Sequence, residues 1–177
     1  MSESNNTIQS TIIRFGTYFG LIVVSYNFIS NYMGLSNEFS WMTIGVYFGI
    51  FFTSLFIIIP LAQFNQRKSN NNLLSLAEGM KIGLGIFLIG FLMIVMSQII
   101  IWEFLTKQDQ FVSSLQEFMI DTMPPEALTD EMLYQAAEDA RNPFSLRQIT
   151  QKISGNLLVI SLYTLITSLV IKKSKSN

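Results

Sequence analysis

The feature that most constrains the fold is the stretch at residues 82–102, which holds no charged residue and lies between Lys81 and Glu103. A helix of this length rises roughly 31 Å, which matches the ~30 Å hydrocarbon core of a bilayer. The loop before Lys81 is basic and the chain after Glu103 is acidic. We therefore expect residues 82–102 to form a transmembrane helix that separates two differently charged compartments.

The composition supports a membrane protein. Half of the 177 residues are hydrophobic and only 13% are charged, about half the charged share of a soluble domain. Three further stretches have the length and apolar character of spans, at residues 12–33, 41–61 and 153–171. The sequence thus predicts a single all-α membrane domain, residues 1–177, with four antiparallel transmembrane helices.

Several boundaries follow from local signals. We expect residues 1–10 to be disordered, residues 33–38 to form a tight turn, and Pro60 to end or kink the second span in its last turn. The Asn/Ser-rich stretch at residues 63–72 reads as a surface loop.

Residues 103–152 form an acidic insertion between the third and fourth spans. Its apolar residues recur at helical spacing and predict an amphipathic helix that rests on the membrane surface or caps the bundle: Phe104, Phe111, Leu115, Phe118 and Met119. Pro124 and Pro125 would stop that helix, Thr129 would cap a second short helix, and Ser145 with Gln148 has the form of a capping box.

Lys and Arg set the expected orientation. With both termini cytoplasmic, most basic residues lie on the inner side: Arg14, Arg67, Lys68, Lys81, Lys172, Lys173 and Lys175. The long outer insertion holds Lys107, Arg141, Arg147 and Lys152 among many acids. The positive-inside rule therefore predicts that both ends are cytoplasmic and that the insertion is extracytoplasmic.

Small residues four apart recur in three of the spans and predict close helix packing. The pairs are Gly16 with Gly20, Gly45 with Gly49, and Gly79 with Gly83. At 100° per residue, Gly90 and Ser97 lie within about 40° of the third pair, whereas Gly85 projects about 200° from Gly83. Packing within the bundle is one use of these faces, and contact with a second copy or a partner's helix is another.

Four amide side chains lie inside the spans: Asn27, Asn31, Gln98 and Asn156. They are expected to form hydrogen bonds between helices or, alternatively, to line a solute path. No Asp, Glu, Lys, Arg or His lies deep in any span. Proton relays and ion-coupled transporters rely on such residues, so a coupled pump is not expected.

The residue inventory argues against most catalysis. The chain contains no Cys and no His, which excludes thiolate chemistry, Cys/His zinc sites and histidine bases. The acids of the insertion do not match a calcium-binding loop and are expected to form a solvated face: Glu117, Asp121, Glu126, Asp130, Glu131, Glu138 and Asp139. We expect no catalytic, metal or cofactor site, and no nucleic-acid partner.

Several short motifs point to a family. They are Arg14-Phe15-Gly16 with Gly20, the run from Glu78 to Gly83, Arg141-Asn142-Pro143-Phe144, and the ending from Leu165 to Lys173. In these runs the chain resembles a family of small bacterial membrane proteins known as domain of unknown function 4199. The resemblance implies a four-helix protein of the bacterial inner membrane and carries no activity.

Two functions from different classes remain. One is a non-catalytic accessory or regulatory subunit that docks partner membrane proteins in a larger complex through helix packing, with the lipid bilayer as its surroundings. The alternative is a small-solute or ion channel or transporter that acts as a homo-oligomer. An enzyme acting on lipid through outer carboxylates is a weaker third reading.

Overall fold

The computed structural model describes residues 2–35 and 40–173 of the protein. Its helices are α1 (Ser2–Tyr32), α2 (Trp41–Ser69), α3 (Leu76–Phe104), α4 (Gln108–Thr122), the 3₁₀ turn η2 (Pro125–Ala127), α5 (Asp130–Arg141) and α6 (Leu146–Ile171). The second half of the turn expected at residues 33–38, and Lys175, lie outside the described residues.

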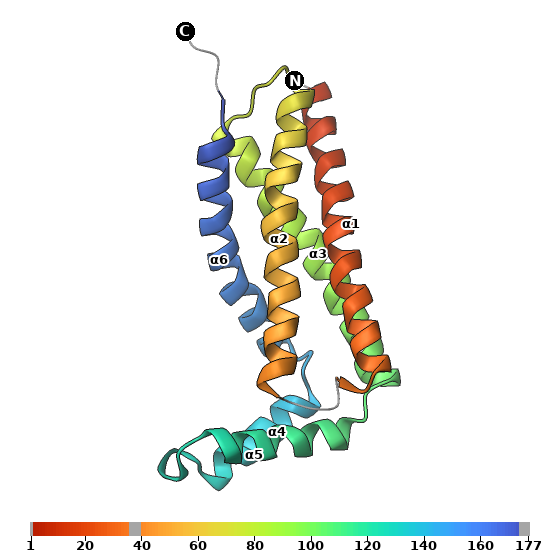
Figure 1. The fold of residues 1–177 in the computed structure, drawn as a ribbon, viewed down its shortest axis with the longest axis vertical. Helices are drawn as coiled ribbons and strands as arrows, with labels where there is room; N and C mark the ends of the chain where they lie inside the picture. The colour runs from red at the N-terminus through yellow and green to blue at the C-terminus, as the bar shows by residue number, and fades with distance from the viewer. Residues whose placement is uncertain (1, 36–39, 174–177) are drawn as a thin grey trace.

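The fold is all-α, as predicted, and four helices are long and apolar enough to cross a membrane: α1, α2, α3 and α6. They run antiparallel in chain order (Figure 1). We call the end where α1 begins and α6 finishes the terminus end, and the opposite end, where α4 and α5 lie, the insertion end.

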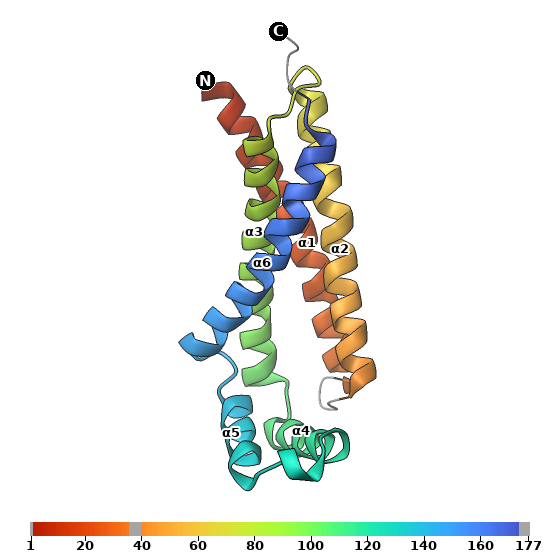
Figure 2. The ribbon, with the colours of Figure 1, turned by 90° about the vertical axis from the view of Figure 1, so that its left-hand side faces the viewer.

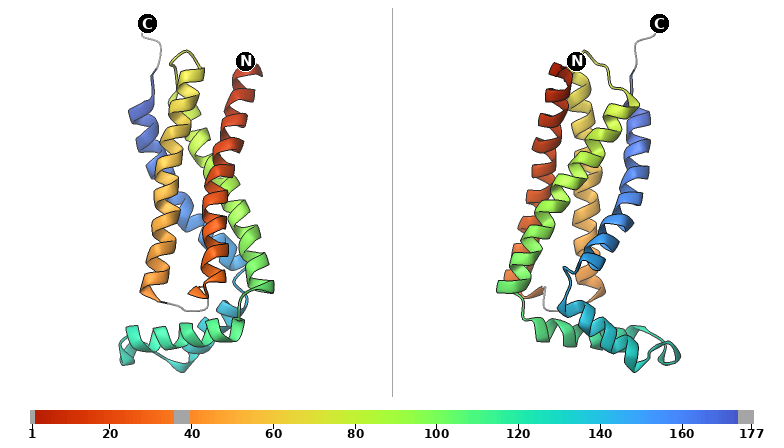
Figure 3. Two further views of the ribbon diagram at one scale, coloured as in Figure 1. Left: turned by 45° about the vertical axis from the view of Figure 1, so that its right-hand side comes forward. Right: turned by 180° about the vertical axis from the view of Figure 1, so that it is seen from behind.

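Helix α3 makes the most extensive contacts in the bundle, with α1 above all and also with α6 and α2. It crosses the bundle obliquely, starting beside the last turns of α6 and finishing beside α1 (Figure 3). The first half of α6 leans away from the bundle toward the insertion end (Figure 2). The spans are therefore tightly packed at the terminus end and splayed at the insertion end.

Helix α2 departs from the predicted boundary. It runs past residue 61 to Ser69, with Pro60 inside it, so Pro60 does not end the span. Proline lacks the N–H that would bond the carbonyl four residues earlier, at Phe56. The hydroxyl of Tyr163 on α6 donates to that carbonyl at 2.6 Å and supplies the missing partner. A residue on another span thus allows the helix to continue.

The disorder predicted for residues 1–10 is also wrong from Ser2 onward, where α1 begins, and Met1 lies outside the described residues. This part of α1 belongs to the bundle, because Ile8 and Thr11 are buried. The helix ends follow the expected local signals more closely. The Thr129 hydroxyl accepts from the Met132 amide, and Ser145 accepts from the Gln148 amide, although the Gln148 side chain bonds Asp139 instead of completing a capping box.

The insertion caps one end of the bundle. Helix α4 lies across that end and packs against α5 (Figure 1). Two edge-to-face ring pairs hold α4 to the spans: Trp102 with Phe111 at 5.4 Å, and Trp41 with Phe118 at 5.2 Å between ring centroids. The apolar face predicted for this helix therefore lies against the spans as a cap.

Candidate functional site

The glycines at the start of α3 let this helix approach α6. A methyl group placed on Gly79 would lie 2.5 Å from Ser168 Oγ, and one on Gly83 would lie 2.6 Å from Thr164 Oγ1. Real Cβ atoms do not come so close to their neighbours, so only glycine fits this crossing. Thr164 and Ser168 are fully buried. Close approach at small residues is how helices gain packing energy in lipid.

A second set of glycines forms the contact between α1 and α3. A methyl group on Gly90 would lie 3.2 Å from the Gly16 carbonyl oxygen, and one on Gly20 would lie 2.7 Å from Met93 Sδ. Ser97 is buried and donates to the Ile94 carbonyl of its own helix at 2.8 Å. Gly85, expected away from the packing face, also has a close neighbour, since its methyl group would lie 2.7 Å from Ile12 Cγ2.

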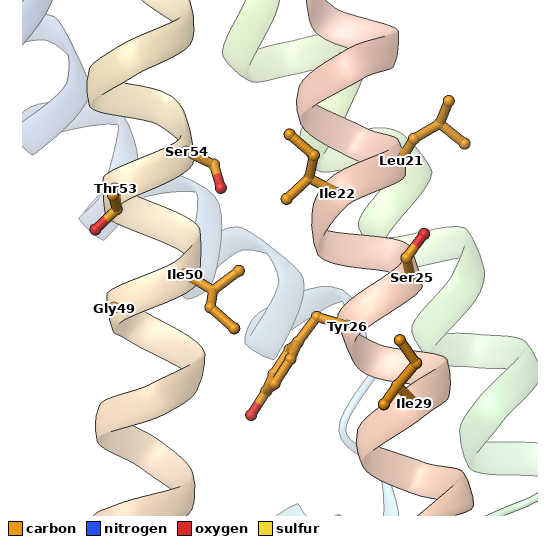
Figure 4. Close-up of a pocket in the computed structure, with 9 residues that line it drawn as sticks. All are labelled: Leu21, Ile22, Ser25, Tyr26, Ile29, Gly49, Ile50, Thr53 and Ser54. Atoms are coloured by element: carbon orange, nitrogen blue, oxygen red, sulfur yellow. The ribbon is translucent and has the colours of Figure 1, made fainter.

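Gly45 and Gly49 of α2 differ from the other pairs. No described atom lies within 4 Å of a methyl group placed at either position, so packing of this pair within the bundle is not observed. Gly49 borders a shallow groove between α1 and α2, about 750 Å³ in volume. Ile22 and Tyr26 of α1 point across it toward Ile50 of α2 (Figure 4). The pair is thus free to contact another molecule.

The terminus end holds a polar cluster that sequence reasoning missed, comprising Thr11, Gln63, Gln66 and Ser168. The Gln63 Nε2 atom donates to Ser168 Oγ at 2.9 Å and to the Gly79 carbonyl at 3.1 Å, and Thr11 donates to Gln66 Oε1 at 2.9 Å. Gln63 and Gln66 lie in the Asn/Ser-rich stretch predicted to be a surface loop, a prediction that is wrong as far as Ser69, where α2 ends. In the bundle they are buried and join all four spans.

At the insertion end the spans border a partly open chamber of about 670 Å³, which residues of α4 and α5 also line. Asn27 of α1 and Gln98 of α3 line it, together with Tyr47 of α2 and Lys152 of α6. A smaller cavity of about 240 Å³ shares Tyr47, Gln98 and Lys152, and is also lined by Asn156. Three of the four predicted intramembrane amides therefore gather around connected space.

The hydrogen bonds of these amides differ. Gln98 Nε2 donates to the Tyr47 hydroxyl at 3.3 Å, and Asn156 Nδ2 donates to the Lys152 carbonyl of its own helix at 2.8 Å. Asn31 donates to Thr106 Oγ1 at 3.4 Å. Asn27 is 9% exposed, and its Nδ2 atom is buried without an acceptor among the described residues.

Apolar residues close the chamber toward the middle of the bundle. Phe19 and Phe51 meet edge to face at 5.4 Å between ring centroids, and Phe87 is fully buried beside them in the same core cluster. Among the described residues, no group of three or more Asp, Glu, His or Cys side chains is placed to hold a metal ion. The chamber can bind a molecule from one side through apolar walls and a few hydrogen-bonding groups.

Comparison with known families matches the model of one family, described as "Protein of unknown function (DUF4199)", to residues 14–173. The match begins within α1 and runs to the residues that follow α6, and so includes most of α1, the other three long helices and the insertion. No curated protein and no solved structure matches the chain.

Proposed function

The chain belongs to the DUF4199 family, whose function is unknown, and we propose that it is a non-catalytic accessory or regulatory subunit of a larger membrane complex. In this proposal a transmembrane helix of a partner protein lies against the groove between α1 and α2. We further propose that the protein resides in the bacterial inner membrane with both termini cytoplasmic, because Lys and Arg concentrate at the terminus end.

The unused glycine pair on α2 is the observation that carries this proposal. The other small-residue pairs, on α1 and α3, are filled by neighbouring side chains, whereas Gly45 and Gly49 face open space. Within a bilayer there is little hydrophobic force between helices, so close backbone contact at small residues is a main source of affinity. A third helix in the groove could approach α2 at Gly49 as closely as α6 approaches α3 at Gly83.

The groove offers polar groups as well as a smooth surface. Ser25 of α1 and Thr53 and Ser54 of α2 line it among aliphatic side chains. Hydroxyls of this kind form interhelical hydrogen bonds worth ~0.6 kcal/mol on average in membranes. Small residues with nearby hydroxyls suit a helix from another protein better than they suit lipid chains alone.

Purification in a mild detergent, with the composition of the complex measured by mass spectrometry, tests the proposal. We expect a stoichiometric larger partner with the wild-type chain and its loss with Gly49→Leu, which fills the contact. Gly155→Leu is the matched control, since Gly155 also has no described atom within 4 Å of an added methyl group. A monomer without any partner, or equal retention of the partner by both variants, would contradict the proposal.

The chamber favours a second candidate, passage of a small solute through an oligomer. Asn27, Gln98 and Asn156 would then line the entrance. The layer of Phe19, Phe51 and Phe87 counts against an open path through a single copy. Solute flux into liposomes that contain only the purified chain would support this candidate and overturn the subunit proposal.

A further inference from the structure

The chamber at the insertion end presents more hydrogen-bond donors than the protein satisfies. The Asn27 Nδ2 atom has no acceptor among the described residues. The Tyr47 hydroxyl accepts from Gln98 Nε2, which leaves its own proton available. Buried polar groups are nearly always paired, and an unpaired one costs about 1–3 kcal/mol. Asn27 lines the chamber, so an acceptor bound there is a candidate partner for this donor.

A cation also lines the chamber. Lys152 lines both the chamber and the smaller cavity that extends from it, and its Nζ atom donates to the Pro143 carbonyl at 3.2 Å. Asp139, the acid that lines the chamber, also lines a surface pocket with Glu138 and Arg141 on the outside of the insertion. Both residues are exposed, so each charge lies on an open part of the wall: Lys152 where the chamber meets the smaller cavity, and Asp139 where it meets the surface pocket.

Most of the remaining chamber wall is apolar and includes several aromatic rings, with a few hydroxyl groups among them. Phe48, Trp102, Phe111 and Phe144 line it. Phe48 is 47% exposed on α2, one of the spans that face lipid, so the chamber is not sealed from the bilayer. Its volume falls within the range of about 300–1,000 Å³ typical of small-molecule sites, which are mostly apolar with a few placed polar groups.

We propose that the chamber binds an amphiphile with an oxyanionic head and an apolar chain. The head lies against Asn27, Tyr47 and Lys152, which donate hydrogen bonds to it, and the chain lies against the aromatic wall. A fatty carboxylate and the phosphate of an anionic lipid share this chemistry. This inference does not depend on the α1–α2 groove, which shares Tyr26 with the chamber wall but is lined by none of Asn27, Tyr47 and Lys152.

Fluorescence quenching by brominated amphiphiles tests the proposal directly, because Trp102 lines the chamber. The protein is used with Trp41→Phe, so that Trp102 is its single tryptophan. The probes are dibromostearate, its uncharged methyl ester, and phosphatidylglycerol with a brominated acyl chain, each titrated in a non-ionic detergent. We expect saturable quenching by at least one anionic probe and much weaker quenching by the ester. Whether dibromostearate or the phosphatidylglycerol saturates at the lower concentration identifies a free fatty acid or a lipid headgroup as the source.

Variants of the donors complete the test. Lys152→Met and Asn27→Leu should each lower the affinity for the anionic probe roughly tenfold or more, as expected for the loss of a charged or buried hydrogen bond. Lys81→Met, which removes an exposed charge at the terminus end, should leave the affinity unchanged. Melting temperatures show whether each variant folds. If Asn27→Leu does not fold, the affinity measured with Lys152→Met tests the proposal alone. Equal quenching by the ester, quenching that never saturates, or unchanged affinity in the folded donor variants would overturn the proposal.

Discussion

Tyr163→Phe isolates one hydrogen bond that the structure predicts to be unusually important. The Tyr163 hydroxyl donates at 2.6 Å to the Phe56 carbonyl, which Pro60 leaves without an intrahelical partner. The substitution keeps the ring and its contact with Phe56, whose centroid lies 4.3 Å away. The change therefore removes little more than the bond itself.

The magnitude follows from where the carbonyl lies. In water a freed carbonyl would bind solvent, but within the hydrocarbon region an unsatisfied backbone group has no such partner. Leaving one buried group unpaired costs about 1–3 kcal/mol. We expect Tyr163→Phe to lower the free energy of unfolding by that amount, measured by helical circular dichroism during titration of detergent micelles with sodium dodecyl sulfate.

A second substitution makes the reasoning refutable. In Pro60→Ala the restored N–H can bond the Phe56 carbonyl within the helix, so Tyr163→Phe should then cost less than about 0.5 kcal/mol. Tyr18→Phe, which removes a hydroxyl from a half-exposed ring on α1, is the control for loss of a phenol. If Tyr163→Phe costs the same with Pro60 as with Ala at position 60, the hydroxyl does not replace the missing helical bond and the explanation is wrong.

Two further outcomes are expected from single positions. Gly83→Ala should lower the free energy of unfolding by about 1–2 kcal/mol because overpacking outweighs the gain in helix propensity, whereas Gly155→Ala should be neutral or stabilising by up to ~1 kcal/mol. Equal free energies of unfolding for Gly83→Ala and Gly155→Ala in the same detergent assay would contradict the tight contact between α3 and α6 at Gly83. For the orientation, Glu126→Cys should react with an impermeant maleimide on intact cells and Asn71→Cys should not, in a chain that has no other cysteine; the reverse pattern would invert the proposed topology.

The helices were predictable because their signals are local. An uncharged apolar stretch of sufficient length specifies a span, and Thr129 at the start of α5 specifies a cap, without knowledge of the neighbours. The extent of α2 was not predictable in this way. Whether Pro60 ends the helix depends on Tyr163, which follows it by a long stretch of chain and comes close only in the folded bundle.

The candidate sites show the same limit. Helical periodicity placed Gly45 with Gly49, and Gly79 with Gly83, on smooth faces, but periodicity does not say which face finds a neighbour. The structure fills the second pair and leaves the first open. Asn27 and Gln98 were identified as polar residues within spans, whereas Lys152 was counted only as a flanking charge, since its approach to the chamber depends on the tilt of α6.

The tight and open ends of the bundle have one cause. At Gly79 and Gly83 the backbones of α3 and α6 meet closely because both sides present small residues or hydroxyls. Farther along, α3 turns toward α1, where Gly90 fits beside Gly16, and α6 is left without a partner at Gly155. Two oblique helices that touch at one end separate at the other, and both α3 and α6 line the chamber that opens there. The glycines that pack the terminus end therefore also determine the width of the site at the insertion end.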